Sequence, residues 1–159
     1  MKQSQKFTAN NSSRELDAAI ALMVRCPANT PSLAELAKAA SLSITSLNRK
    51  FHNQLGLTPR RWFWKFRTQL AAEMLATAPQ ASCLSISRRC GFASMAHFSR
   101  RFHVAFEQPP RAFRAHCQLN CTSIDSHAHP ADIDINELIE RTLNLMGKAE
   151  CHPGIKTPL

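Results

Sequence analysis

Apolar side chains recur every three or four positions through residues 13–114, and this period is typical of helices that bury one face. Ser, Thr, Gly and Pro interrupt the pattern at positions where they cap or end helices. The elements between these signals are a first helix after Ser13, short helices after Ser32 and Ser82, longer helices after Ser43 and Ser94, and a long helix over 59–77. The sequence predicts an all-α protein with polar tails.

The long helix predicted over 59–77 joins the two halves of the pattern. Its apolar residues are spaced by four, so they share one inward face: Trp62, Phe66, Leu70 and Met74. Its basic residues are expected mostly on the outside of the helix: Arg60, Arg61, Lys65 and Arg67.

The two halves are an internal repeat. Eight residues of the first half recur 51 positions later: Ser43, Leu47, Arg49, Lys50, Phe51, His52, Leu55 and Pro59 return as Ser94, Phe98, Arg100, Arg101, Phe102, His103, Phe106 and Pro110. Upstream of the capping serines the offset falls to 50, so the two turns should differ by one residue. We therefore expect two homeodomain-like helix-turn-helix subdomains, at about 32–56 and 82–106, joined by a linker helix.

Positive charge is concentrated in the repeated region. Residues 1–28 hold four basic and two acidic groups, residues 29–114 thirteen and three, and residues 115–159 three and six, which gives +2, +10 and −3 for the net +9. Such a helical region suits a polyanion, because neutralised phosphates release counterions. A solvated basic surface is the alternative interpretation of the charge alone.

The second helix of each unit has a polar outer face of the kind that enters the major groove of DNA. Arg can bind guanine with two hydrogen bonds, Asn can pair with adenine, and small apolar groups can touch the thymine methyl. The candidates for reading bases are Thr45, Ser46, Asn48 and Arg49 in the first unit and Ala96, His97, Ser99 and Arg100 in the second.

These segments resemble the AraC/XylS family of bacterial transcription regulators. SLAELAKAASLSITSLNRKFHNQLGLTP is similar to the family's first helix-turn-helix, and ISRRCGFASMAHFSRRFHVAFEQPPRAFR to its second. The resemblance covers about residues 13–114. It implies a transcription activator that binds double-stranded DNA as a monomer or weak dimer and contacts RNA polymerase. It implies phosphate contacts or helix caps at Ser43, Lys50, Thr58, Arg60, Arg61, Ser94 and Arg101.

The second unit departs from the family pattern at three positions. Ser85 and Ser87 replace an acidic residue and an Ala, and Glu107 replaces the Gly that ends the recognition helix. A left-handed Glu would cost about 1 kcal/mol. The second unit is therefore expected to be the less stable of the two.

The ends of the chain differ from its centre. Residues 1–12 are polar and are expected to be disordered, and residues 115–159 form an acidic extension with an amphipathic helix over 134–146. That helix could pack on the core or pair with another chain.

The Cys and His residues of the extension match no zinc spacing, so no metal or other cofactor is expected. Because few residues precede the first helix, the chain is either a stand-alone regulator or a shortened descendant of a longer one.

Several function classes lack support in the sequence. No apolar run approaches the roughly 20 residues of a membrane span, and the N-terminus lacks the apolar stretch of a signal peptide. We therefore expect a cytoplasmic protein with six reduced cysteines. No catalytic motif stands out, so the chain is not expected to be an enzyme. The main rival hypothesis is a degenerate regulator that acts as a protein-interaction module.

Overall fold

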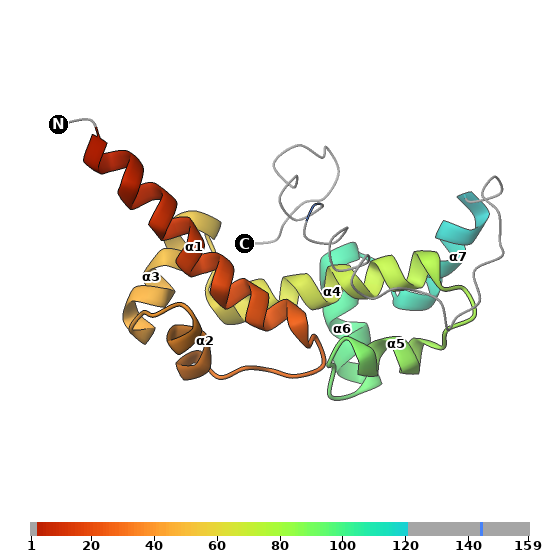
Figure 1. The fold of residues 1–159 in the computed structure, drawn as a ribbon. Helices are drawn as coiled ribbons and strands as arrows, with labels where there is room; N and C mark the ends of the chain where they lie inside the picture. The colour runs from red at the N-terminus through yellow and green to blue at the C-terminus, as the bar shows by residue number, and fades with distance from the viewer. Residues whose placement is uncertain (1–2, 121–143, 145–159) are drawn as a thin grey trace. The chain divides into compact units, whose positions relative to one another are not determined.

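The computed structural model describes residues 3–120 and Asn144. In this part of the chain the backbone forms helices and no strand (Figure 1). The helices are α1 (Gln3–Arg25), α2 (Leu33–Ala39), α3 (Ile44–Leu55), α4 (Pro59–Thr77), α5 (Cys83–Arg89), α6 (Met95–Phe106) and α7 (Pro110–Asn120). The predicted all-α class is confirmed. The helix predicted over 134–146 lies outside the described residues, apart from Asn144.

The N-terminal helix is longer than the sequence analysis predicted. It begins at Gln3 instead of after Ser13, so the prediction of disorder is wrong for residues 3–12. Neither Pro nor Gly occurs in this stretch, and extending an existing helix costs far less than starting one. The C-terminal half of α1 buries Leu16, Ala19 and Met23, which anchors the helix.

The chain divides into two compact units, with the boundary inside α4 between Trp64 and Lys65. In the first unit α1, α2 and α3 all pack against one another. Leu36, Leu47 and Phe51 lie at the centre, with at most 3% of their surface exposed. The first turn of α4 adds Trp62, whose ring meets Phe51 edge-on at a centroid distance of 6.4 Å.

The second unit has an aromatic core between α6 and α7. Phe98 and Phe102 are fully buried, with their ring centroids 5.6 Å apart. Phe113 of α7 lies 5.3 Å from Phe102 and 5.2 Å from Phe106. The spacing by four along α6 thus builds the core that the repeat predicts, because it places these rings on one helix face.

Arg67 is the exception to the predicted outward placement of basic residues on α4. Its side chain is fully buried, and its Nη1 donates to the carbonyl oxygen of Gly91 at 3.3 Å. Burial lowers the pKa of Arg67 to about 10, so the guanidinium stays charged at neutral pH. The position corresponds to Leu16 in the first unit, 51 residues earlier, and therefore belongs to the core-facing side of the helix.

The turns inside the two helix-turn-helix units end their first helices in the same way. The amide of Leu42 donates to the Ala37 carbonyl at 2.8 Å, and that of Phe92 to the Ser87 carbonyl at 2.9 Å. Both are the long hydrogen bond of a Schellman motif. The first turn covers residues 40–43 and the second covers 90–94, so the predicted difference of one residue is confirmed.

Candidate nucleic-acid interface

The two candidate recognition helices, α3 and α6, start at the predicted caps. The Oγ of Ser43 accepts a hydrogen bond from the amide of Ser46 at 3.1 Å, and the Oγ of Ser94 accepts one from the amide of His97 at 3.2 Å. Each cap satisfies one of the amides that a helix leaves unpaired at its start. Both recognition helices therefore begin at equivalent positions of the repeat.

The face of α3 opposite the core is polar. Leu47 and Phe51 are fully buried, whereas Thr45 and Arg49 are exposed. The two other candidates of this helix, Ser46 and Asn48, are partly exposed. The structure therefore brings the four predicted base-reading residues of the first unit to the accessible side of a single helix.

The same arrangement recurs on α6. Ala96 and Arg100 are exposed, and His97 and Ser99 are partly exposed. Because Arg100 stands 51 positions after Arg49, the two units expose a guanidinium at the same helical position. The second unit offers a less polar surface around its arginine, since Ala96 replaces Thr45.

His97 has an altered acidity. Its ring meets the buried ring of Phe92 edge-on, with the centroids 5.8 Å apart. Burial lowers the pKa of His97, and the nearby positive charges of Arg101 and Arg100 lower it further. The imidazole is therefore neutral at pH 7, and a neutral imidazole has one nitrogen that donates and one that accepts.

The candidate phosphate ligands differ in their surroundings. Lys50 is partly exposed and forms an ion pair with Glu15 of α1, whereas its repeat counterpart Arg101 is exposed. Glu15 lies 35 residues before Lys50, so the helical pattern does not predict this pairing. Arg60 and Arg61 are exposed at the start of α4, where the Oγ1 of Thr58 accepts from the amide of Arg61 at 3.3 Å.

One exposed arginine was missed. Arg111 at the start of α7 stands 51 positions after Arg60, and the pair Pro59-Arg60 recurs as Pro110-Arg111. Extending the repeat by one residue would have found it. Nearby Arg114 has a structural role: its Nη2 donates to the carbonyl of Ala81 at 2.6 Å, which ties α7 to the loop before α5.

The described residues contain neither a metal-binding cluster nor a membrane-spanning helix. No group of three or more His, Cys, Asp or Glu side chains within 3–120 is arranged to hold a metal ion. No helix in that range is both long and apolar enough to cross a membrane. The cysteines and histidines after Asn120, and with them most of the acidic extension, lie outside the described residues.

Comparison with known proteins places this geometry in a family. The sequence model of a family described as a helix-turn-helix domain matches residues 36–116. An AraC-type transcriptional regulator from Chromobacterium violaceum has a similar structure, with a TM-score of 0.62, 29% sequence identity, and coverage of 67% of this chain and 94% of that one. The chain belongs to the AraC/XylS family.

Other AraC/XylS relatives share the same region. The transcriptional activator RhaS of Shigella boydii is 34% identical over 113 residues, and that of Escherichia coli strain SE11 is 33% identical over 113 residues. Each match covers 71% of this chain but only 40% of the RhaS chain. The DNA-binding domain of AdpA, solved with a target DNA, shares the fold at a TM-score of 0.63 and 24% identity, with 69% of this chain and 97% of that one covered.

Proposed function

We propose that this AraC/XylS chain is a sequence-specific DNA-binding transcription regulator that inserts α3 and α6 into the major groove. The observation that carries the proposal is the matched exposure of Arg49 and Arg100 on the outer faces of two repeated helices. RhaS of Shigella boydii, which is 34% identical to this chain over 113 residues, is named a transcriptional activator. Activation is therefore the direction of regulation that we propose.

The outer faces of the two helices supply groups for reading bases. Arg49 and Arg100 each carry the planar set of donors that fits the two acceptors of guanine. Asn48 suits adenine, and the methyl groups of Thr45 and Ala96 suit the methyl of thymine. Neutral His97 can donate to or accept from a base edge. Ser46 and Ser99, at the borders of the two faces, complete the proposed base-reading set.

A second set of residues is proposed to hold the DNA backbone. Phosphate contacts fix orientation without reading sequence and account for most of the salt dependence of binding. We assign this role to exposed cations and to hydroxyls at helix starts: Ser43, Thr58, Arg60, Arg61, Ser94 and Arg101. Lys50 belongs to the set only when DNA displaces Glu15, with which it is paired.

The partners follow from this assignment. Because each unit carries its own recognition helix, a monomer can bind two neighbouring elements of double-stranded DNA, and a weak dimer would extend the contact. An activator acts on RNA polymerase, which we propose as the protein partner. The chain would act in the cytoplasm, where bacterial DNA is found.

A protein-interaction module is the second candidate function. The observation that favours it is Glu107, which holds a left-handed conformation at the end of α6 with φ of 56°. Strain at this end of the recognition helix weakens the second unit as a DNA reader. Binding to RNA polymerase that persists without DNA and at high salt would support this second candidate.

The deciding experiment selects genomic fragments with the purified full chain at about 150 mM salt and maps the bound sites by footprinting, because such salt suppresses non-specific binding. Two protected patches about one helical turn, roughly 34 Å, apart would support the proposal. Diffuse protection that disappears as salt is raised would contradict sequence-specific binding.

The arginines can be tested on the selected site. Arg49→Ala and Arg100→Ala should each weaken binding by about 1–3 kcal/mol and relax the preference at one base pair. The matched control is Arg89→Ala, which removes an exposed arginine from the last turn of α5. An equal loss on all DNA sequences would instead identify Arg49 and Arg100 as phosphate contacts.

A further inference from the structure

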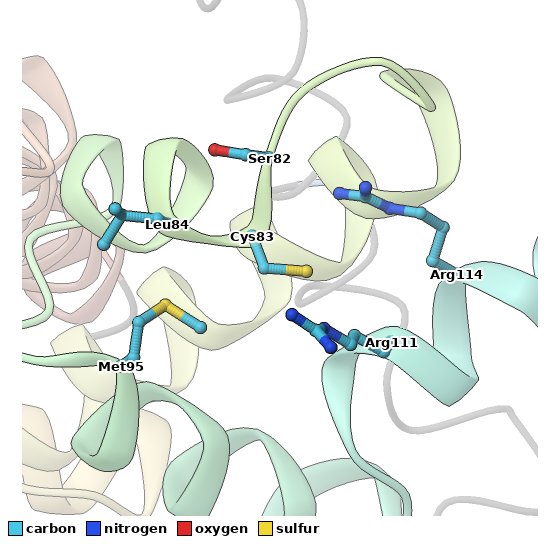
Figure 2. A pocket seen from close by; sticks show the side chains of 6 residues that line it. All are labelled: Ser82, Cys83, Leu84, Met95, Arg111 and Arg114. Carbon is cyan, nitrogen blue, oxygen red and sulfur yellow. The ribbon is translucent and has the colours of Figure 1, made fainter.

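A cavity of about 480 Å³ lies in the second unit, next to the start of α6. Its walls come from three helices, as Figure 2 shows. Met95 is the first residue of α6 and immediately precedes the proposed base-reading residue Ala96. The lining residues are Ser82, Cys83, Leu84, Met95, Arg111 and Arg114.

The cavity combines positive charge with apolar walls. The guanidinium of Arg111 points toward Cys83 and Met95 (Figure 2). Leu84, which leaves 46% of its surface exposed, and Met95 supply an apolar wall. No acidic side chain is among the six residues that line the cavity. An anion attached to an apolar group would satisfy both features.

Arg114 anchors the helix that carries Arg111. Arg114 donates to the carbonyls of Pro79 and Ala81 at 3.4 and 2.6 Å, and these bonds tie α7 to the loop before α5. Both terminal nitrogens of Arg114 thus donate to backbone carbonyls, and we assign it a positioning role. Arg111, one helical turn earlier, faces the cavity.

The internal repeat gives independent support. Arg111 corresponds to Arg60, and in both units this arginine follows a proline at the start of the helix after the recognition helix. Both arginines are exposed. A cation placed twice at the same position relative to a recognition helix points to a ligand that both units meet, and a continuous DNA backbone is such a ligand.

We propose that this cavity binds one phosphodiester group of the DNA backbone beside the second recognition helix. The N–H groups of Arg111 donate to the phosphate oxygens, and Leu84 and Met95 pack against the attached deoxyribose. This inference rests on the proposed DNA-binding function and adds a backbone site to it. A bound backbone would also cover the partly exposed thiol of Cys83, which gives the site a chemical reporter.

The first test measures alkylation of Cys83 by N-ethylmaleimide. The protein is the full chain with Cys26, Cys117, Cys121 and Cys151 replaced by Ser. Buried Cys90 can stay, because burial raises the pKa of its thiol to about 12 and thiolates are the reactive form. A mixed-sequence duplex about three helical turns long, at low salt, should slow the alkylation at least tenfold.

The second test replaces Arg111. Arg111→Gln should weaken binding of the same duplex about tenfold and reduce the slope of log K against log salt by about 0.9, the value for one phosphate contact. Arg111→Lys should keep the slope, since the charge remains. Arg89→Gln, the same charge change outside the cavity, should leave the affinity within about twofold.

The outcomes separate this inference from the function on which it rests. If the duplex binds tightly but Cys83 reacts at its free rate, the backbone site is wrong and DNA binding stands. Slowing by inorganic phosphate or a fatty acid, but not by DNA, would identify a small-anion site and also overturn the proposal. If neither this duplex nor any genomic fragment binds, the proposed function itself fails.

Discussion

At the residue scale, the repeat shows where the second unit deviates from the first. Gly56 and Glu107 occupy equivalent positions after their recognition helices, with φ of 65° and 56°. The left-handed conformation expected for Glu107 is confirmed. This conformation is easy for glycine and costs other residues about 1 kcal/mol, because their Cβ crowds the backbone. The two positions thus differ in backbone strain while sharing the same geometry.

Substitutions at these two positions should change the stability of the chain in opposite directions. Glu107→Gly is expected to raise the free energy of unfolding by about 1 kcal/mol, and Gly56→Glu to lower it by a similar amount. A Cβ on Gly56 would meet no atom within 4 Å, so the loss there reports strain instead of a clash. Urea titrations monitored by tryptophan fluorescence and circular dichroism measure both changes. A stability unaffected by Glu107→Gly would refute the strain argument.

His97 links stability to pH. Burial, Arg101 and Arg100 hold the pKa of His97 below its usual value of 6.5, so the unfolded chain takes up this proton before the folded chain does. Stability from this residue is full above about pH 6.5 and is lost as the pH falls toward the pKa of the folded chain. Stability falls at low pH because the folded chain favours the neutral form of this imidazole.

The His97→Gln variant should therefore lose less stability than the wild type when the pH falls from about 7.5 to about 5.5. Urea midpoints at the two pH values measure the difference. His103→Gln is the matched control, because His103 lies exposed on the same helix, and its pH dependence should follow that of the wild type. Identical losses in wild type and His97→Gln would show that this imidazole is not the responsible group.

At the scale of elements, the first helices of the two units begin differently. The Oγ of Ser32 accepts from the amide of Glu35 at 3.2 Å, and the amide of Ser32 donates to the Glu35 carboxylate at 2.8 Å. These reciprocal bonds form a capping box. In the second unit the Oγ of Ser82 accepts from the amide of Ser85 at 3.0 Å, and a serine is too short to complete the box.

Ser85→Glu should supply the missing half of the box on α5. The expected gain in the free energy of unfolding is about 0.5 kcal/mol, because the new carboxylate accepts from an amide that the helix otherwise leaves unpaired. Ser85→Gln separates the hydrogen bond from the charge and should retain part of the gain. A thermal melt of each variant measures it. Unchanged melting of both variants would mean that the amide of Ser82 is already satisfied by water.

The helix starts and turns could be predicted because they depend on residues close in sequence. Ser43 and Ser94 cap their helices through contacts only three residues away. The failures involve distant partners: buried Arg67 binds the carbonyl of Gly91, 24 residues later, and Lys50 is paired with Glu15, 35 residues earlier. Helical period carries no information on what packs against a helix, so it does not reveal either partner.

At the scale of the whole chain, positive charge lies in residues 1–120 and negative charge in residues 121–159, and this separation affects the binding of DNA. Residues 1–120 hold seventeen basic and five acidic groups, a net +12, and residues 121–159 hold three basic and six acidic groups, a net −3. All exposed cations of the proposed interface lie in the first part. The acidic extension therefore opposes the approach of DNA through long-range repulsion, which salt screens beyond about 10 Å at 0.1 M.

A chain ending at Asn120 should consequently bind a mixed-sequence duplex more tightly than the full chain at low salt, and equally well at about 0.3 M salt, where the repulsion is screened. The slope of log K against log salt should stay within about one phosphate of the full chain, because every cation proposed to touch the backbone remains. Fluorescence anisotropy over a salt series measures both quantities. Neutralising the six acidic residues after Asn120 in the full chain should reproduce the gain without removing any backbone. A slope that falls by several phosphates on truncation would instead mean that the extension itself contacts DNA, and the interface would then have to be redrawn to include it.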